Sequence, residues 1–311
     1  MMFNNLFLCR LVGCWPALAL VLGLVPAAHA QRTVQVVTRI IEQQLACPAN
    51  GQVRIRAETA TVRVQGWDQP TVRLVMRLIA KHPERAVAEQ ELSAAHYRFA
   101  ARGRTIDVAN YFTLAAGAPA LRSDLRAEYT LWVPAGVAVE LHNAYGHSTL
   151  TGLSGPQVLT QEFGPIVLSQ LRGTLVVKAK YADLTGHDTN LTFSCEADKS
   201  AIQLTQAGGT YTIRNTYGSV RIEPSEELKS LYIEAERSEI TIGVARLDRY
   251  NYNLGNTHGA LVLPAALSAA QTQTLGRKVL SVTNRPRLPL IRAYTTFAPL
   301  TLQALPLLAQ P

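Results

Sequence analysis

The chain has 311 residues, with 30 Lys and Arg against 22 Asp and Glu and a formal net charge of +8. Apolar residues make up 48% of the chain and charged residues 17%, which excludes a disordered chain or a coiled coil and allows a sizeable core. The positive charge favours anionic partners, but Lys and Arg are dispersed without a run of five like charges. A soluble basic surface is therefore the simpler interpretation, and nucleic acid is not an expected partner.

The first thirty residues are typical of a secretory signal peptide. An uncharged apolar run over residues 11–28 leads into Ala28-His29-Ala30, a small-x-small cleavage site. We expect cleavage between Ala30 and Gln31, which exports the chain to the periplasm, the outer surface or the medium. An uncleaved membrane anchor is the alternative, but two prolines interrupt the run. Residues 31–311 contain no further segment apolar enough to span a membrane.

Cysteine usage gives no sign of a metal site or a disulfide framework. Beyond residue 30 the chain keeps only Cys47 and Cys195, and a bridge between these two is left open. No C-x-x-C or H-E-x-x-H motif occurs, and the G-G-x-G-x-D letters of calcium-binding β-rolls are missing. We therefore expect no metal and no cofactor.

An internal repeat dominates the second half of the chain. An aromatic residue, replaced once by Lys199, recurs every eighteen residues with a small residue after it, and each such repeat is called a rung below. Arg237-Ser238 continues the series after twenty residues, residues 256–263 copy residues 215–222, and residues 297–302 copy residues 163–168. The regular members are Tyr145-Gly146, Phe163-Gly164, Tyr181-Ala182, Lys199-Ser200 and Tyr217-Gly218.

Four columns of the repeat are almost entirely apolar, which predicts a shared buried face. Only Gln157, Gly186 and Ser148 break the rule. Two short strands per rung predict an all-β fold, a flattened β-solenoid with about eighteen residues per turn. The columns are Leu141, Leu159, Val177, Cys195, Ile213, Ile233; Leu150, Leu168, Gly186, Leu204, Ile222, Ile242; Val139, Gln157, Leu175, Phe193, Tyr211, Leu231; and Ser148, Ile166, Leu184, Ile202, Val220, Ile240.

An antiparallel meander is the alternative arrangement of these strands. A solenoid stacks each residue on the one eighteen positions later, whereas a meander separates those two residues by a strand. The outward column Thr160, Lys178, Glu196, Arg214, Glu234 alternates in charge, as neighbouring rungs require. The charges therefore favour the solenoid.

The flanking segments extend the same body, so residues 31–311 are expected to form one continuous unit. Residues 53–135 are predicted to form divergent N-terminal rungs, residues 137–263 the regular rungs, residues 264–290 a loop-rich excursion and residues 291–302 the last rung. Pro83 followed by Ala88, Leu92 and Ala95 on one stripe predicts one short side helix over residues 83–95. The expected N-terminal strands cover residues 53–56, 61–65, 72–79, 96–101, 105–109 and 127–133.

Three short motifs resemble the bacterial putative-adhesin domain family. They are Gly66-Trp67-Asp68 after an early strand, Val133-Pro134-Ala135-Gly136 before the rungs, and the tandem Tyr-Gly corners from Tyr145 onward. The resemblance covers roughly residues 50–302. The resemblance implies an exported β-solenoid with a role in the envelope or at the surface. The chain departs from the aromatic corner pattern at Lys199, Arg237 and His258.

Motifs for catalysis are missing from the sequence: no G-x-S-x-G, S-x-x-K, phosphate loop or dinucleotide fingerprint occurs. A polysaccharide-active β-helix enzyme would need clustered carboxylates. The nearest cluster is Asp183, Asp188, Glu196 and Asp198, and the solenoid register places basic residues beside Glu196 and Asp198. We therefore expect no catalytic residues.

The candidate binding residues are the corner aromatics Tyr145, Phe163, Tyr181 and Tyr217, because exposed rings can bind sugars; covering the bend of the chain is their alternative role. The sequence thus predicts a non-enzymatic envelope or surface module that binds or acts as a scaffold. Its expected partner is an envelope protein or a glycan. Two alternatives remain, an envelope-stress signalling partner of a membrane protein and a polysaccharide-active enzyme.

Overall fold

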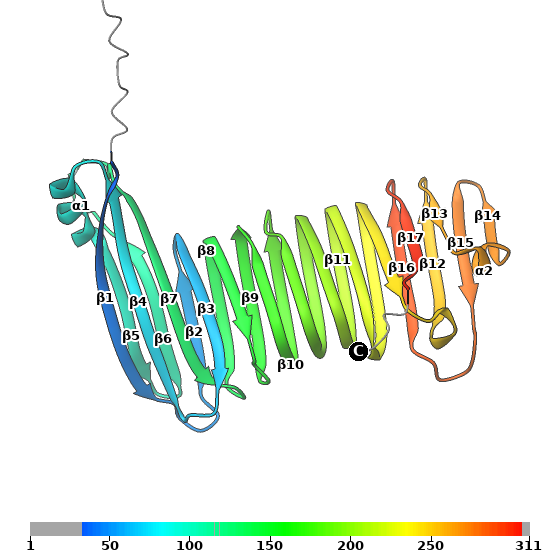
Figure 1. Ribbon diagram of the computed structural model, residues 1–311, viewed down its shortest axis with the longest axis horizontal. Coiled ribbons are helices and arrows are strands. Elements are labelled where there is room, and N and C mark those ends of the chain that lie inside the picture. Colours follow the sequence, from blue (N-terminus) through cyan, green and yellow to red (C-terminus); the bar gives the residue numbers. More distant parts are fainter. Residues whose placement is uncertain (1–32, 115, 118, 307–311) are drawn as a thin grey trace, which may run out of the picture. The chain divides into compact units, whose positions relative to one another are not determined.

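The computed structural model describes residues 33–114, 116–117 and 119–306, and these are almost entirely β-strand (Figure 1). The strands form a 17-stranded sheet, accompanied by the short helices α1 (Arg85–Glu91) and α2 (Ala265–Ser268). The all-β class predicted from the sequence is confirmed. In chain order the strands are β1 (Gln35–Ala46), β2 (Gln52–Ala57), β3 (Ala60–Trp67), β4 (Thr71–His82), β5 (Ala95–Arg102), β6 (Thr105–Phe112), β7 (Asp124–Pro134), β8 (Ala138–Thr151), β9 (Pro156–Phe163), β10 (Ile166–Lys180), β11 (Leu184–Val244), β12 (Asn251–Thr257), β13 (Leu261–Val262), β14 (Gln271–Thr274), β15 (Arg277–Val282), β16 (Leu290–Thr296) and β17 (Leu300–Ala304).

Strand pairing from β8 to β11 is parallel. Val139 pairs with Gln157 and Leu175 pairs with Phe193, so each residue lies beside the one 18 positions later. Side-chain contacts in the first part of β11 have the same spacing, as between His187 and Thr205, and the spacing is 20 residues between Arg214 and Glu234. The strands of this part are therefore not an antiparallel meander.

The apolar columns form the core of this part. Every apolar side chain in the four columns is at most 2% exposed. Gly186 is buried in its column, and any larger residue is excluded there because a Cβ would come within 2.5 Å of Cδ2 of Leu204. Gln157 is also buried, and its Nε2 donates to the carbonyl oxygen of Gly155 at 2.8 Å. Burial of each large aliphatic side chain contributes about 1.5–3 kcal/mol, so the stacked columns stabilise the rungs.

The N-terminal strands join the same sheet with mixed pairing. Strand β2 lies between β6 and β8, and β3 lies between β7 and β8, all in parallel. Beyond them β4 pairs antiparallel with both β7 and β1, and β5 pairs antiparallel with β6. All six strands expected in this region are present, although several are longer than predicted.

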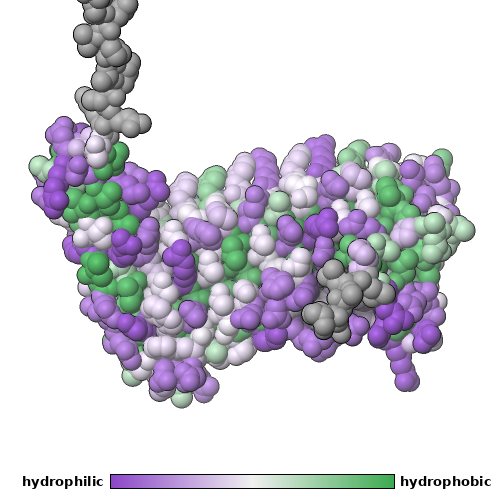
Figure 2. Space-filling model, in the orientation of Figure 1, coloured by the Kyte–Doolittle hydropathy of each residue, from purple (hydrophilic) through white to green (hydrophobic). Residues whose placement is uncertain are grey.

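Strand β1 was not predicted from the sequence. It is an edge strand that pairs only with β4 among the described strands, and Ile41 is its one buried residue. Val34, Val36 and Ile40 are 54–68% exposed, and Figure 2 shows hydrophobic surface at this end of the sheet. Because β1 buries only one side chain, its apolar and polar residues do not alternate regularly, and the sequence therefore showed no sign of a strand.

The predicted side helix is confirmed as α1 followed by a 3-10 turn over Leu92–Ala94. Ala88, Leu92 and Ala95, three positions of the predicted stripe, are all buried. The helix packs against β1 and β4 and covers that part of the core.

The C-terminal segment departs from the predicted order of rungs. Strands β16 and β17 do not form the last rung but lie between β11 and the pair β12 and β13, with parallel pairing on both sides (Figure 1). The expected loop-rich excursion over residues 264–290 contains α2, β14 and β15. Strand β15 pairs antiparallel with β12 and so covers the edge that a rung would otherwise leave open.

Among the described residues, no helix is long and apolar enough to cross a membrane. The predicted cleavage site at Ala30 and Gln31 lies outside the described residues. Cys47 and Cys195 are both free, and Cys195 is 1% exposed within the core. Burial, and secondarily the nearby carboxylate of Glu196, raises the pKa of the Cys195 thiol to about 12, which makes it a structural thiol.

Candidate functional site

The side chains at one corner of the rungs form a continuous exposed stack, which we call the corner ladder. The rings of Tyr145 and Phe163 lie 5.0 Å apart and nearly parallel, and those of Phe163 and Tyr181 lie 5.3 Å apart. The stack continues across the inserted strands, because His258 stacks on Phe297 at 5.3 Å. In spatial order the corner ladder consists of Tyr145, Phe163, Tyr181, Lys199, Tyr217, Arg237, Phe297 and His258.

Cations take the places of rings at two positions of the corner ladder. Nζ of Lys199 lies 4.9 Å from the ring centre of Tyr181 and donates a hydrogen bond to its hydroxyl at 2.7 Å. This hydrogen bond raises the pKa of Lys199, so the ammonium form persists. The guanidinium carbon of Arg237 lies 5.5 Å from the ring centre of Tyr217 and 5.8 Å from that of Phe297. Cation–π contacts therefore replace ring stacking where the aromatic pattern stops.

The backbone at this corner must adopt a left-handed conformation. Tyr181 and Tyr217 have φ of 51° and 54°, whereas in two other rungs the glycine after the ring takes the positive φ. At Gly164 a Cβ would come within 2.0 Å of the carbonyl oxygen of Gly146. A side chain at that glycine is therefore excluded by the close stacking of successive corners.

Buried amides support the corner from inside, two residues before the corner side chain. Nδ2 of Asn215 donates to the carbonyl oxygen of Ser200 at 3.2 Å, and Nε2 of Gln161 donates to that of Gly164 at 2.8 Å. Asn143 and Asn256 make similar bonds to corner carbonyls. These residues were not predicted from the sequence, although Asn or Gln recurs there two positions before a corner side chain.

The geometry of the corner ladder limits how its rings can bind a ligand. Tyr145, Phe163, Tyr181 and Tyr217 are 38–51% exposed, as expected of binding residues. However, both faces of Phe163 are covered by neighbouring rings, Tyr181 lies between Phe163 and Lys199, and Arg237 covers one face of Tyr217. The interior rings thus offer edges and hydroxyls to a ligand, while stacking a sugar needs a free face.

Tyr145 is the first ring of the corner ladder, and the face of its ring that is turned away from Phe163 has no ring or cation stacked on it among the described residues. The next corner position is Thr59, since Ala60 pairs with Gly146, and the one after that is Arg126, since Ala60 also pairs with Ala127. A hollow of about 250 Å³ lies here, lined by Thr59, Ala60, Thr61, Asp124, Arg126, Ala127, Glu128, Tyr145 and Gly146. We call this hollow the corner slot.

Ion pairs balance the charges around the corner slot. Nη2 of Arg126 lies 2.7 Å from Oδ2 of Asp124, and this contact raises the pKa of Arg126. Glu128 lies 3.7 Å from Nη1 of Arg77 on β4. The slot therefore offers both donors and acceptors with little net charge.

A second, larger groove of about 610 Å³ lies beside the other end of the corner ladder, over β11, β16, β12 and β15. Tyr294 covers Gly255 there, where a Cβ would come within 2.8 Å of the tyrosine ring. Arg214 and Glu234 form an ion pair at 3.4 Å on one wall, and Arg277 lines the groove as well. The groove adjoins Tyr217, Arg237, Phe297 and His258, because its lining includes the residue that precedes each of them.

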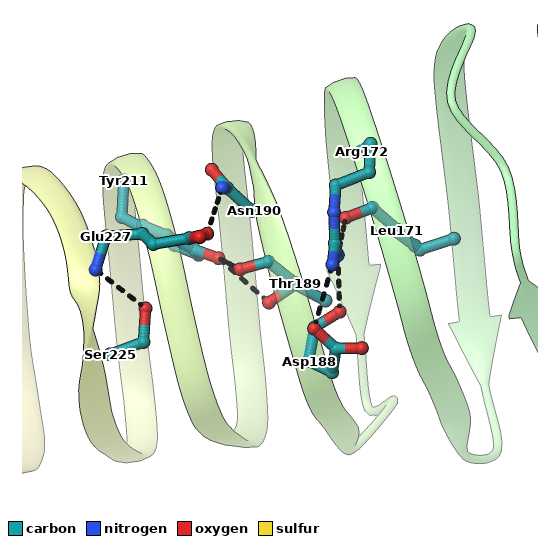
Figure 3. A network of polar contacts seen from close by, with 8 residues as sticks. All are labelled: Leu171, Arg172, Asp188, Thr189, Asn190, Tyr211, Ser225 and Glu227. Atoms are coloured by element: carbon teal, nitrogen blue, oxygen red, sulfur yellow. Dashed lines mark hydrogen bonds and ion pairs between the residues drawn. The ribbon is translucent and has the colours of Figure 1, made fainter.

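The opposite corner of the rungs carries polar side chains that bind one rung to the next (Figure 3). Arg172 donates to the carbonyl and carboxylate oxygens of Asp188, both at 3.0 Å. The hydroxyl of Tyr211 donates to the carbonyl oxygen of Thr189 at 2.9 Å, and Asn190 binds Glu227. These contacts occupy the polar groups of this corner in structural roles.

The carboxylates considered for catalysis are not gathered into a site. Asp188 is held by Arg172, and Oδ1 of Asp183 accepts the backbone N–H of Ala201 at 2.8 Å. Glu196 and Asp198 lie beside Lys178 and Lys180 in the strand register. In the part of the chain that the structure describes, no group of three or more His, Cys, Asp or Glu side chains is placed to hold a metal ion.

Fold and site together define an all-β protein with parallel rungs and an exposed corner ladder. No family model matches the chain, and no curated protein matches it. Solved structures resemble it at low identity. A "putative lipid binding protein" from Parabacteroides distasonis is 9% identical over 85% of this chain and 96% of its own, with a TM-score of 0.40.

Two further structures carry names from adhesion. A "putative cell adhesion protein" from Clostridium sporogenes is 10% identical over 86% of this chain and 100% of its own, with a TM-score of 0.26. A "putative adhesin" from Bacteroides fragilis is 8% identical over 86% and 97%, with a TM-score of 0.30.

Proposed function

We propose that the chain is an exported, non-enzymatic binding module of the cell envelope or surface, built as a flattened β-solenoid with about eighteen residues per turn. The parallel register of 18 residues and the buried columns support the solenoid. Export rests on the signal peptide of residues 1–30. Adhesion, the role named for two of the similar structures, is the role proposed here.

The corner ladder is the observation that carries this proposal. Its ring edges, tyrosine hydroxyls and cations are exposed side by side from Tyr145 to His258. The corner slot adjoins one end of the ladder and the groove at Tyr294 adjoins the other. With Thr59 included, the corner passes nine rungs, about 40 Å at the usual strand spacing. A row of this length suits an extended ligand such as a glycan chain or a segment of an envelope protein.

The arrangement of carboxylates supports binding over catalysis. Asp183 and Asp188 are engaged in hydrogen bonds, and Glu196 and Asp198 lie opposite lysines. Hydrolysis of a glycosidic bond needs two free carboxyl groups on either side of the bond. The polysaccharide-active enzyme therefore has less support than the binding module.

The proposal is tested by exposing the chain from residue 31 onward to a glycan array and to a whole-envelope extract, with mass spectrometry of whatever is retained or cleaved. We expect retention without cleavage. Tyr217→Ser, which removes a ladder ring, should lower retention at least fivefold. Arg172→Ser at the opposite corner is the matched control and should retain as well as the wild type. Cleaved glycan, or equal retention by both variants, would contradict the proposal.

A further inference from the structure

Thr59 is the one described corner position between Arg126 and His258 that carries neither a ring nor a cation. Thr59 occupies the corner between Tyr145 and Arg126, and the strand pairing of Ala60 with Gly146 and Ala127 fixes this order. The backbone N–H of Ala127 donates to the carbonyl oxygen of Thr59 at 3.2 Å, which confirms that the two rungs are in contact. The short side chain at Thr59 leaves the ring of Tyr145 uncovered on this side, where the corner slot lies.

The corner slot has the dimensions of one ring. Corner positions two rungs apart are separated by about 9–10 Å at the usual strand spacing. A ring in van der Waals contact on both faces needs about 7–8 Å, so one ring fits between Tyr145 and Arg126. The hollow of about 250 Å³ is smaller than sites for drug-sized ligands, which have roughly 300–1,000 Å³.

The groups around the corner slot are those that bind hydroxyls. Asp124 and Glu128 accept hydrogen bonds, Arg126 donates them, and the hydroxyls of Thr59 and Thr61 do both. Because Arg126 is paired with Asp124 and Glu128 with Arg77, the slot has no excess charge that would select an anion or a cation. A purely aromatic ligand would cover these polar groups without satisfying them, which is unfavourable.

We infer that the corner slot binds one pyranose ring of a neutral glycan, with a C–H face of the sugar on the free face of Tyr145 and its hydroxyls on Asp124, Arg126 and Glu128. This inference rests on the proposed function, because it names the ligand class and the first subsite of the same corner ladder. The rest of the glycan extends along the ring edges toward Tyr217.

The test uses four neutral probes: methyl β-glucopyranoside, methyl β-galactopyranoside, methyl α-mannopyranoside and N-acetylglucosamine. Each is titrated to 50 mM against the chain from residue 31 onward, with saturation-transfer NMR and calorimetry as readouts. We expect at least one probe to bind with a millimolar dissociation constant. Glucuronate, added as an anionic probe, should bind no better than the corresponding neutral sugar.

Thr59→Tyr is the most direct test, because it places a ring beside Tyr145 and so fills the corner slot. Thr59 already has the left-handed φ of 47° that Tyr181 and Tyr217 adopt, so the corner accepts tyrosine without a change of backbone. This variant should fold, melt no lower than the wild type and bind the probe at least tenfold more weakly. Tyr145→Ser, which removes the platform, is the second variant and should lose binding to the same extent.

Tyr217→Ser is the matched control, because it removes a ladder ring far from the slot and should change binding of the probe less than threefold. Loss of binding in Thr59→Tyr and Tyr145→Ser but not in Tyr217→Ser supports the inference. Probe binding by Thr59→Tyr at wild-type strength overturns it. If the wild type retains envelope material but none of the probes, the slot is refuted while the binding module stands; if it retains neither, both fail.

Discussion

Arg237 lies between the rings of Tyr217 and Phe297, with its guanidinium carbon 5.5 Å and 5.8 Å from their centres. Phe297 belongs to the corner between β16 and β17, whereas Arg237 lies within β11. The corner ladder thus runs unbroken through strands that are far apart in the sequence. The contact of Arg237 with Phe297 holds the inserted strands β16 and β17 against β11 at the surface. In the core, the buried apolar columns do the same.

Phe297→Ser should therefore weaken the C-terminal rungs. The ring loses stacking on His258 and a cation–π contact with Arg237, which together contribute about 1–2 kcal/mol. The free energy of unfolding from urea titration measures the loss. Leu275→Ser is the control, because Leu275 is 99% exposed and its replacement should change stability by less than about 0.5 kcal/mol. Equal stability of the two variants would refute the role of Phe297.

Ile213→Asp should unfold the central rungs. Ile213 is fully buried in an apolar column, and a carboxylate there has no partner, so the cost exceeds about 4 kcal/mol. Circular dichroism and thermal melting report the loss of structure. Thr212→Asp places the same charge one residue earlier, on the half-exposed face, and should still fold. An unchanged melting temperature for Ile213→Asp would contradict the burial of this column.

Arg214→Glu should destabilise the rungs in a salt-dependent manner. Nε of Arg214 lies 3.4 Å from Oε2 of Glu234, and glutamate at this position would join Glu196 and Glu234 in one column. Because both side chains of the pair are 56% exposed, the loss should be about 1 kcal/mol at low salt and should shrink at 1 M salt. Arg214→Gln, which removes only the attraction, should lose about half as much. A loss independent of salt would exclude the charge argument.

Stability should fall steeply above pH 10. Burial raises the pKa of Tyr211 to about 12, and it also raises the pKa of Tyr129 and Tyr252. A tyrosine of the unfolded chain has a pKa of about 10. The buried phenols stay protonated in the fold, so their contribution to stability is complete below pH 10 and is lost progressively as the pH rises toward 12. At pH 11, one unit above the pKa of an unfolded phenol, Tyr211 alone should account for a loss of about 1.4 kcal/mol. Urea titrations between pH 8 and 11 should therefore show a steeper decline for the wild type than for Tyr211→Phe.

The two cysteines should differ in reactivity. Cys195 is buried with a pKa raised to about 12, whereas Cys47 is only partly buried and its pKa is raised by burial as well. In the folded chain from residue 31 onward, a thiol reagent at pH 8 should modify Cys47 slowly and leave Cys195 unmodified. Both should react in 8 M urea. Because both thiols are free, reducing agents should not change the melting temperature.

Much of the fold could be predicted from the sequence, because burial in a stacked structure repeats at a fixed interval. The apolar columns, including positions as distinct as Cys195 and Tyr211, are all buried as expected. The N-terminal strands were predicted from alternating apolar and polar residues, and the side helix from an apolar stripe at helical spacing. Strand β1 buries only Ile41 and so gives no such signal.

The order of the C-terminal rungs could not be predicted. The repeat marks residues 297–302 as a rung, but every rung has similar edges, so the sequence does not say which two neighbours it joins. Strand β15 was not predicted for a related reason: it lies beyond the last rung, between β12 and β14, and buries only Leu280.

The candidate site was predicted in its residues but not in its geometry. Tyr145, Phe163, Tyr181 and Tyr217 do form an exposed ladder, yet the stacking that builds it covers the ring faces of the interior members. The corner slot depends on Thr59, which belongs to no regular rung and is placed beside Tyr145 only by the pairing of β3 with β8.

The insertion of β16 and β17 has a consequence for the order of folding. From β9 to β11 the rungs can add one after another, since each pairs with the segment that precedes it in the chain. Beyond Val244 this is impossible, because β12 and β13 contact β11 only through strands that follow them in the sequence. Their docking must wait for residues 290–304, so the C-terminal rungs should assemble in one late cooperative step and protect their amides from exchange together.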